Sequence, residues 1–462
     1  MIGSLMRYIE SKADEYVEDL RKLCRQPSVS AQGVGIEECA ELLRELMEEA
    51  GISARVYPVK EGNPVVLGEV RGGKEKNGCI GFYNHYDVQP PEPLELWETP
   101  PFEAAIRDGK IYARGVSDNK GNVMARIEAV KAVRDVLGEV PIDLKFLVEG
   151  EEEVGSPHLP NFVKGHAHLL KADGYIWEGD GVDEKNRPVI TLGAKGIIYV
   201  EFRARGAKRD AHSSSAPLIP NPAWRLVWAL STIKGPDEKI RIPGWYDDVV
   251  EPSDVERKLL EEAPFEEEEK KRELGLKEFL GGLKGFEALK ALYFSPTATI
   301  CGLDAGYKGP GAKTVLPCEA VAKMDFRLVE AQKPRKLLKM LREHLDREGF
   351  SDIEVVSYSG YEPAKTSPSD PFARYFIETV EKVYGNKPVV LPTTAGTSPI
   401  YTIRNWMGIP VASGGGVGYP RSNVHAPNEN IRIEDYIRSI KFVATLITSY
   451  KPERLRKTAE KG

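Results

Sequence analysis

The residues of this chain that are best suited to bind metal ions fall at the ends of expected strands. They are His85, Asp118, the acidic run Glu151–Glu153, Glu178 and, far downstream, His425. Imidazole nitrogens and carboxylate oxygens are ligands that zinc, manganese and cobalt accept. Because no single helix or strand can surround two cations, ligands gathered from several strand ends indicate a buried dinuclear metal site. Such a site would hydrolyse an amide bond.

The acidic run follows the apolar segment at 142–150 and places four carboxylates within five residues, Glu149 and Glu151–Glu153. Carboxylates at this density repel one another unless cations neutralise them or solvent screens them. One glutamate would serve as a ligand and another as the general base for a metal-bound water. A solvated acidic turn is the alternative interpretation.

The other candidates also have two interpretations. Asp87, two residues after His85, could accept a hydrogen bond from the imidazole, or the two could form a surface pair. Asp118 precedes an expected helix, where it would be either a helix cap or a carboxylate bridging two cations. Glu178 and Asp180 are equally plausible ligands in the sequence WEGDG. His212 is either a loop histidine or a donor to a substrate oxyanion.

The composition narrows the class of protein. The chain has 462 residues, 41% of them apolar and 29% charged, as in an ordinary globular protein. Its net charge of −6 argues against nucleic acid as a partner. It contains no run of about 18 apolar residues, so we expect no membrane span. Arg7, Glu10 and Asp14 stand where a signal peptide would have its apolar core, which predicts a cytoplasmic location.

The order of the expected elements predicts an α/β fold with a second domain inserted into the first. Strands alternate with helices over the first 190 residues or so, which favours a mixed or parallel sheet. From IIYVEFRARG at 197–206 onward, one-faced strands and an amphipathic helix at 333–350 predict a smaller α+β domain. A helix at 371–385 and a buried strand at 409–415 would return to the first sheet. The predicted boundaries are 1–197 and 369–462 for the catalytic domain and 198–368 for the insert.

Seven short motifs occur in a fixed order: HYDVQP at 85–90, ARGVSDNKG at 113–121, EEEVGS at 151–156, AHS at 211–213, GAKTVLP at 311–317, FRLV at 326–329 and VHAPNE at 424–429. Together they resemble the aminoacylase/carnosinase/carboxypeptidase G family of dinuclear zinc hydrolases, most closely its carnosinase-like dipeptidase branch. The similarity covers nearly the whole chain. It implies a zinc-peptidase-type catalytic domain, with a mixed central sheet flanked by helices, and an inserted lid through which the protein forms a homodimer.

The resemblance also implies a set of metal ligands. His85 and Glu153 would bind one metal ion, and Glu178 (or Asp180) and His425 would bind the other. Asp118 would bridge the two ions, and the peptide bond that follows it would be cis. The cofactors implied are two divalent ions per subunit, zinc in the first place, with manganese or cobalt also compatible with the ligands.

Roles in catalysis follow from the same resemblance. Glu152 would be the general base, Asp87 would orient His85, and His212 would stabilise the oxyanion in the active site of the partner subunit. The substrate carboxylate would be held by Arg327, Thr314 and Ser398, and arginine suits this role through its bidentate fork.

Two departures from the family pattern bear on the substrate. The chain has Glu178 where many members have aspartate, and it has TAGTS at 394–398 where carnosinase-like members have Arg-Glu-Gly-Gly-Ser. The expected function is hydrolysis of a dipeptide or of a short peptide at its carboxyl end. The alternatives are an N-acyl-amino-acid deacylase and, more remotely, a metal-binding scaffold without activity.

Overall fold

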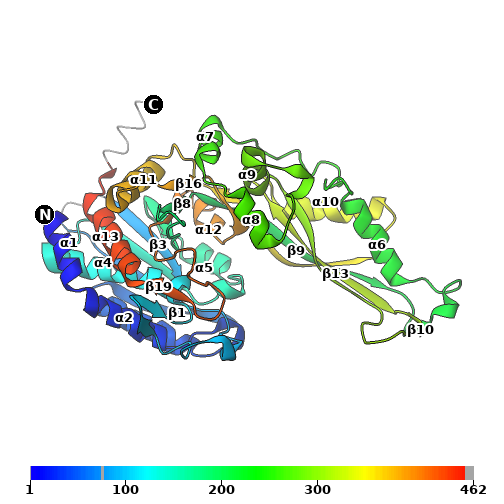
Figure 1. Ribbon diagram of the computed structural model, residues 1–462, viewed down its shortest axis with the longest axis horizontal. Helices are drawn as coiled ribbons and strands as arrows, with labels where there is room; N and C mark the ends of the chain where they lie inside the picture. Colours follow the sequence, from blue (N-terminus) through cyan, green and yellow to red (C-terminus); the bar gives the residue numbers. More distant parts are fainter. Residues whose placement is uncertain (1, 74–77, 453–462) are drawn as a thin grey trace.

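The computed structural model describes residues 2–73 and 78–452, which form a larger and a smaller unit along one long axis (Figure 1). The larger unit is built on an eight-stranded sheet. Its strands in spatial order are β1 (Ser53–Val59), β2 (Gly62–Val70), β6 (Asp143–Glu149), β3 (Cys79–His85), β7 (Gly174–Trp177), β18 (Val411–Gly414), β8 (Val189–Thr191) and β16 (Val389–Leu391).

The sheet is mixed, and its central strands decide where the site lies. β6, β3 and β7 are neighbours and run parallel, whereas β2 is antiparallel to β6. The carboxyl ends of these three strands therefore meet at one edge of the sheet, where ligands of open α/β folds gather. His85, Glu149 and Trp177 are the last residues of β3, β6 and β7.

Helices cover both faces of this sheet. One face carries α1 (Ile2–Ser11), α2 (Ala13–Arg25), α3 (Ile36–Glu49), α4 (Gly121–Leu137), α11 (Pro371–Tyr384) and α13 (Ile433–Ser449), and the other carries α5 (Leu159–His166) and α12 (Tyr401–Arg404). The spacing of the leucines predicts two helices before residue 50. The structure has three, because the chain is interrupted at Lys12, between α1 and α2.

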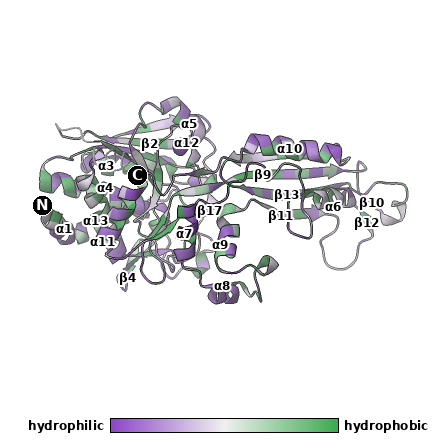
Figure 2. Cartoon of the chain, turned by 90° about the horizontal axis from the view of Figure 1, so that it is seen from above, coloured by the Kyte–Doolittle hydropathy of each residue, from purple (hydrophilic) through white to green (hydrophobic). Residues whose placement is uncertain are grey.

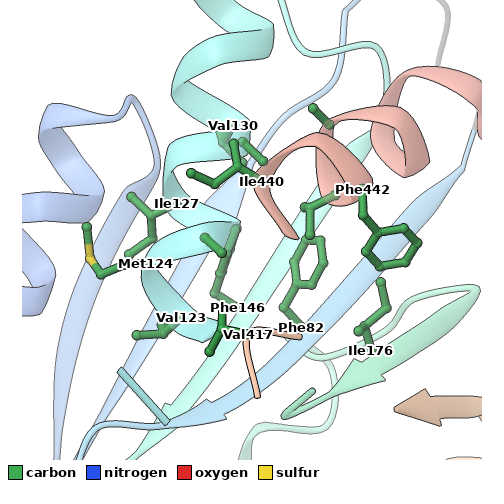
Figure 3. Close-up of a cluster of buried hydrophobic side chains, with 14 of the residues drawn as sticks. Phe82, Val123, Met124, Ile127, Val130, Phe146, Ile176, Val417, Ile440 and Phe442 are labelled. Carbon is green, nitrogen blue, oxygen red and sulfur yellow. The ribbon is translucent and has the colours of Figure 1, made fainter. Parts of the chain in front are cut away.

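Helix α4 lies at the centre of the larger core. Its Val123, Met124 and Ile127 pack with Phe82 and Phe146 of the sheet and with residues of α13 (Figure 3). Because it lies between the sheet and other helices, α4 is buried on nearly all sides. This position brings the start of α4, just after Asp118, to the carboxyl edge of the strands.

The smaller unit is an antiparallel sheet with helices on one face. Its strands in order are β11 (Thr297–Ala305), β13 (Glu319–Leu328), β9 (Gly193–Arg205) and β14 (Glu354–Tyr361). Helices α6 (Pro222–Ile233) and α10 (Pro334–Arg347) enclose its core. Seen from above, β9, β13 and β11 extend away from the larger unit (Figure 2).

Strand β9 connects the two units. Its first residues pair with β15 (Ala364–Lys365) and β17 (Thr394–Thr397), and its later residues lie between β13 and β14. The predicted boundary after residue 197 thus falls within one continuous strand.

The remaining elements lie at the edges of the two sheets. The charge-rich segment before β11 folds into α7 (Asp254–Glu262), α8 (Glu267–Leu274) and α9 (Gly285–Phe294). A small sheet joins β4 (Ala105–Arg107), β5 (Lys110–Tyr112) and β19 (Asn430–Arg432), and a two-stranded ribbon joins β10 (Ala211–His212) to β12 (Val315–Leu316). Within residues 2–73 and 78–452, no helix combines the length and the apolar character that crossing a bilayer requires.

Candidate metal centre

His85 ends β3 with its side chain fully buried. Its Nδ1 lies 3.0 Å from the backbone oxygen of Asp87, and its Nε2 lies 2.9 Å from Oδ1 of Asp118. A proton on Nδ1 would satisfy the first contact and leave Nε2 as the free ligand atom. Burial alone would lower the pKa of His85, but Asp118 and Asp87 outweigh it and hold that pKa well above its usual value.

Asp118 divides its two carboxylate oxygens between two histidines. Oδ1 faces His85, and Oδ2 lies 3.0 Å from Nε2 of His425. The peptide bond after Asp118 is cis, as the resemblance implied. Burial would raise the pKa of Asp118, but the two histidines hold it below its usual value. A carboxylate placed in this way has one oxygen available for each of two cations.

Glu153 lies beside His425. Its Oε2 is 3.2 Å from Nε2 of His425 and accepts a hydrogen bond of 2.9 Å from the Gln89 side chain. Hydrogen bonds to Asp118 and Glu153 raise the pKa of His425 to about 10. The resemblance groups Glu153 with His85, and in the structure the Glu153 carboxylate also contacts His425. Ligand atoms of His85, Asp118 and Glu153 also lie within 4.8 Å of one another.

Glu178 follows β7 in a left-handed conformation, with φ of 36°. Non-glycine residues in such conformations tend to occur at functional sites. Burial, followed by the negative charge of Glu152, holds the pKa of the Glu178 carboxyl well above its usual value. Asp180, the alternative ligand, accepts a hydrogen bond of 2.7 Å from the Thr191 hydroxyl. Because the Asp180 carboxylate already has this partner, Glu178 is the better candidate for the metal ligand.

The acidic turn is fixed by Asp87. Its two oxygens accept hydrogen bonds from the backbone N–H groups of Glu152, at 3.2 Å, and Glu153, at 3.1 Å. Asp87 therefore contacts both the turn and His85. Burial raises the pKa of Glu152 to about 7, although the charge of His85 acts in the opposite direction. A carboxyl with a pKa near neutrality can both take up and release a proton.

The residues present fit two divalent cations. Oε1 of Glu153 and Oε1 of Glu178 are buried, and neither has a hydrogen-bond partner among the described residues. Buried polar atoms are rarely left without a partner. Together with two histidines and the shared Asp118, these oxygens give the nitrogen and oxygen donor set that zinc, manganese and cobalt prefer.

A buried ion pair, not predicted from the sequence, supports the loop of Asp118. Nη1 of Arg114 lies 2.8 Å from the Glu429 carboxylate, and both side chains are almost completely buried. The same carboxylate accepts hydrogen bonds from the backbone N–H groups of Ser117, at 2.9 Å, and Asp118, at 3.0 Å. Arg114 and Glu429 lie inside two of the motifs noted above, ARGVSDNKG and VHAPNE. Their place in these motifs is the sequence signal that could have identified the pair.

Arg327 and Ser398, two of the three residues expected to hold the substrate carboxylate, are connected through hydrogen bonds to the strand end that carries Glu178. Arg327, near the end of β13, donates a hydrogen bond of 2.7 Å from Nη1 to the Thr397 hydroxyl. The next residue, Ser398, accepts one of 2.7 Å from the indole N–H of Trp177. Since Trp177 directly precedes Glu178, Arg327 and Ser398 are both linked to the edge that carries the ligands. Thr397 was not among the expected residues.

His212 and Thr314 lie elsewhere. They are 3.0 Å apart, Nε2 to Oγ1, on the exposed ribbon of β10 and β12. This ribbon forms the tip of the smaller unit, far from the larger one (Figure 1). Thr314 also lies beyond the opposite end of β13 from Arg327. Within one chain, the structure does not bring His212 or Thr314 to the metal ligands.

Comparison with known proteins gives a consistent result. Residues 81–449 match the model of the peptidase family M20/M25/M40. The chain is 28% identical to the Beta-Ala-His dipeptidase of Mus musculus, over 96% of this chain and 94% of that protein. It is 25% identical to a Cys-Gly metallodipeptidase of Schizosaccharomyces pombe, over 96% and 98%. Among solved structures, an M20 family metallo-carboxypeptidase from Sulfolobus solfataricus is similar, with a TM-score of 0.89, 40% identity, and coverage of 94% of this chain and 99% of that one.

Proposed function

The chain belongs to the peptidase family M20/M25/M40, and from this premise we propose that it is a two-metal peptidase of dipeptides and of the carboxyl ends of short peptides. The observation that carries the proposal is the position of Asp118, whose two oxygens face His85 and His425. Glu152 lies in the adjacent acidic turn, which Asp87 fixes.

We assign the ligands from the contacts of Asp118 with both histidines and of Glu153 with His425, which leave Glu178 to the ion at His85. Asp118 would bridge the two ions, His85 and Glu178 would complete one coordination sphere, and Glu153 and His425 would complete the other. The contact between Glu153 and His425 supports this grouping. The buried, unpartnered Oε1 atoms of Glu153 and Glu178 support a ligand role for each of these residues. Zinc is the metal we propose first, with manganese or cobalt as alternatives.

The chemistry assigned to the chain centres on Glu152. When bound, two divalent ions would supply positive charge that polarises the scissile carbonyl and acidifies the attacking water. Glu152 would take a proton from that water as its oxygen bonds to the carbonyl carbon. As the carbon–nitrogen bond breaks, Glu152 would give the proton to the leaving amine. Burial, which raises the pKa of Glu152 in the metal-free protein, favours uptake of that proton by the carboxylate.

Substrate recognition would fall to the residues around β17. Arg327 and Ser398 would bind the free carboxylate next to the leaving nitrogen, because the guanidinium matches a carboxylate with two parallel hydrogen bonds. The Thr397 hydroxyl already orients this guanidinium. The similar proteins are named as dipeptidases and as a metallo-carboxypeptidase, which supports a dipeptide or a peptide carboxyl end as the substrate.

We propose that the smaller unit is a lid that pairs with a second copy of the chain. Trp224 and Trp228 of α6 are more than half exposed and stack on each other, with ring centroids 5.9 Å apart. Strand β11, at the sheet edge, exposes Ile300 and Leu303. Exposed apolar surface of this kind marks interaction sites. In such a homodimer, His212 and Thr314 would enter the partner's site.

We propose the cytoplasm as the compartment. Support comes from α1, whose Leu5 and Ile9 belong to the core while Arg7 and Glu10 remain exposed.

The test is a paired activity screen on metal-reconstituted protein. Dipeptides, tripeptides and N-acetyl amino acids would be compared, with Glu152→Ala as the control. We expect cleavage of peptides that carry a free carboxylate and loss of this activity in the variant, with both metals still bound. Absence of activity on every substrate, despite two bound metals, would sink the peptidase assignment and favour a metal-binding scaffold.

Deacylation of N-acyl amino acids is a second candidate, favoured by one observation. The segment at 394–398, TAGTS, contains no carboxylate that could pair with the free ammonium group of a dipeptide. Cleavage of N-acetyl amino acids alone would move the assignment to this reaction. Cleavage of tripeptides at least as fast as dipeptides would indicate a carboxypeptidase.

A further inference from the structure

Arg126 lies on α4, immediately beneath the candidate metal centre. Its guanidinium is buried, and Nη1 donates a hydrogen bond of 2.6 Å to the backbone oxygen of Tyr83. Nη1 also contacts Oδ1 of Asn84, and Nη2 contacts the backbone oxygen of Glu178. One side chain therefore connects the carboxyl ends of two neighbouring strands, β3 and β7.

The connection continues to the bridging residue. The amide of Asn84 donates to Oδ1 of Asn119, which directly follows Asp118. Since Asn84 directly precedes His85, Arg126 reaches the chain next to His85 and, through Asn84, the chain next to Asp118. Arg126 contacts the backbone oxygen of Glu178 directly. Arg126, Asn84 and Asn119 are all buried.

The chemistry of the guanidinium suits this position. Its planar fork can donate to several acceptors at once, which a lysine ammonium on a flexible stem does not reproduce. No carboxylate accepts a hydrogen bond from Arg126 among the described residues, and its guanidinium carbon lies 5.3 Å from the ring centre of Phe82. Its positive charge thus faces the acidic cluster without being neutralised by a carboxylate in contact.

The backbone at Glu178 explains why such a clamp is needed. Glu178 has φ of 36°, a conformation that is retained only when its surroundings hold it. Its N–H donates to the Tyr83 oxygen at 3.0 Å, and its carbonyl accepts from Arg126. Both peptide groups of Glu178 are therefore fixed, and with them the direction of its carboxylate.

We propose that Arg126 is a positioning residue that sets the geometry of the metal ion held by His85 and Glu178. The inference rests on the metal site proposed above. Arg126 does not touch the metal or the substrate. It acts through Asn84 and through the backbone of Glu178, and the pair Glu153 and His425 lies outside its contacts.

The experiment measures metal binding to metal-free protein rather than activity. Zinc affinities are obtained by competition with a chromophoric chelator, and cobalt(II) spectra report the coordination geometry. For Arg126→Met we expect one of the two zinc ions to bind about 10- to 100-fold more weakly, as for other residues that support metal ligands. The second ion should change much less, and Arg126→Lys should recover only part of the loss.

Controls separate this role from a general effect on folding. Arg134→Met, on the same helix and away from the site, should keep both affinities. If Arg126→Met does not fold, Asn84→Ala becomes decisive, and weakened binding of one ion supports the proposal. Two ions bound as tightly as in the wild type by the folded variant would overturn it. Wild-type protein that binds fewer than two ions would overturn the proposed metal site as well, so the two failures can be told apart.

Discussion

Neighbouring glutamates of the acidic turn have different surroundings, and these give them different expected roles. Glu153 contacts His425 and Gln89, whereas the hydrogen bonds of Glu152 to other described residues involve its backbone, which Asp87 and Gly155 contact. Glu151 turns away and accepts a hydrogen bond of 2.9 Å from His158. One sequence run of three like residues therefore supplies a ligand candidate, a base candidate and a structural carboxylate.

This difference predicts the effects of substitution within the turn. Glu152→Gln should lower kcat by about 10²- to 10⁴-fold, because the amide cannot accept the proton of the attacking water. Both metals should remain bound, which elemental analysis of the purified variant would establish. Glu151→Gln is the matched control and should keep most of the activity. A Glu152→Gln enzyme as fast as the wild type would show that another group is the base.

A second prediction concerns the buried pair Arg114 and Glu429. Glu429→Gln removes the negative charge that faces Arg114, so a buried cation loses its partner, at a cost of about 3–5 kcal/mol in the free energy of unfolding. Urea unfolding of the metal-free protein measures this loss. The double variant Arg114→Met with Glu429→Gln should recover part of it. Equal stability of Glu429→Gln and the wild type would refute the argument.

Sequence reasoning found the candidate ligands for a physical reason. Histidines and carboxylates at strand ends stand out by residue type, and parallel strands bring their ends together. It did not find Arg126 or Glu429, because buried charges are recognisable only by their partners. Glu429 bonds to Arg114, 315 positions earlier in the chain. Nor did it separate Glu178 from Asp180, since the Thr191 hydroxyl that engages Asp180 comes from another strand.

At the scale of elements, α4 combines an apolar surface with two buried charged residues. Arg126 faces the metal centre, and Glu128, with 2% of its surface exposed, lies near Glu15 and Asp19 of α2. Nζ of Lys131 is 3.8 Å from the Glu128 carboxylate, because it is drawn to Glu15, at 2.8 Å, and Asp19, at 3.1 Å. Burial raises the pKa of Glu128 to about 9.

This pKa predicts a stability that falls as the pH rises. The folded protein keeps a proton on Glu128 that the unfolded chain loses above its ordinary pKa. The stabilisation is therefore complete below that ordinary value and is lost as the pH approaches 9. The slope is at most about 1.4 kcal/mol per pH unit. Glu128→Gln has no such proton, so its free energy of unfolding should fall less steeply between about pH 6 and about pH 8.

Urea unfolding of the metal-free protein across this range measures the slope. Glu45→Gln, at an exposed position of α3, is the control and should follow the wild type. Identical slopes for Glu128→Gln and the wild type would mean that Glu128 is ionised in the folded state.

Long periodic elements were the most predictable part of the fold. The expected helix at 333–350 corresponds to α10, Pro334–Arg347, and the helix expected just after Asp118 corresponds to α4, Gly121–Leu137. Short elements such as β10 and β12 were not expected, because two residues carry no periodicity. The three-helix start was read as two, since a break of one residue between amphipathic helices leaves the pattern nearly continuous.

At the scale of the whole molecule, the resemblance drawn from seven motifs is confirmed by the match over residues 81–449, and the expected α/β class is confirmed by the fold and its relatives. The elongated shape separates His212 from the ligands of its own chain (Figure 1). The proposed homodimer resolves this separation, because a second copy can bring the tip of its lid to the site.

The exposed surface of α6 gives a prediction about assembly. Trp224→Glu combined with Trp228→Glu should convert a dimer into a monomer, since charge would replace the exposed apolar rings at the proposed interface. Sedimentation velocity would measure the change. Trp406→Glu, at an exposed position of the larger unit, should leave the dimer intact. A wild-type protein that sediments as a monomer would contradict the proposed role of the lid.

Subunit mixing tests whether His212 acts across the interface. His212→Ala and Glu152→Ala should each be nearly inactive alone, the first lacking the oxyanion donor and the second lacking the base. After dissociation and random reassociation, half of the dimers are mixed, and each mixed dimer contains one site with wild-type Glu152 and the partner's wild-type His212. Activity should therefore recover to about a quarter of the wild-type value.

Recovery requires exchange of subunits, so unmixed variants and variants mixed without dissociation should stay inactive. If the His212→Ala enzyme is fully active, the tip has no catalytic role. If that variant is inactive and exchanged mixtures also stay inactive, His212 serves the site of its own chain, which would require the smaller unit to fold back over the larger one.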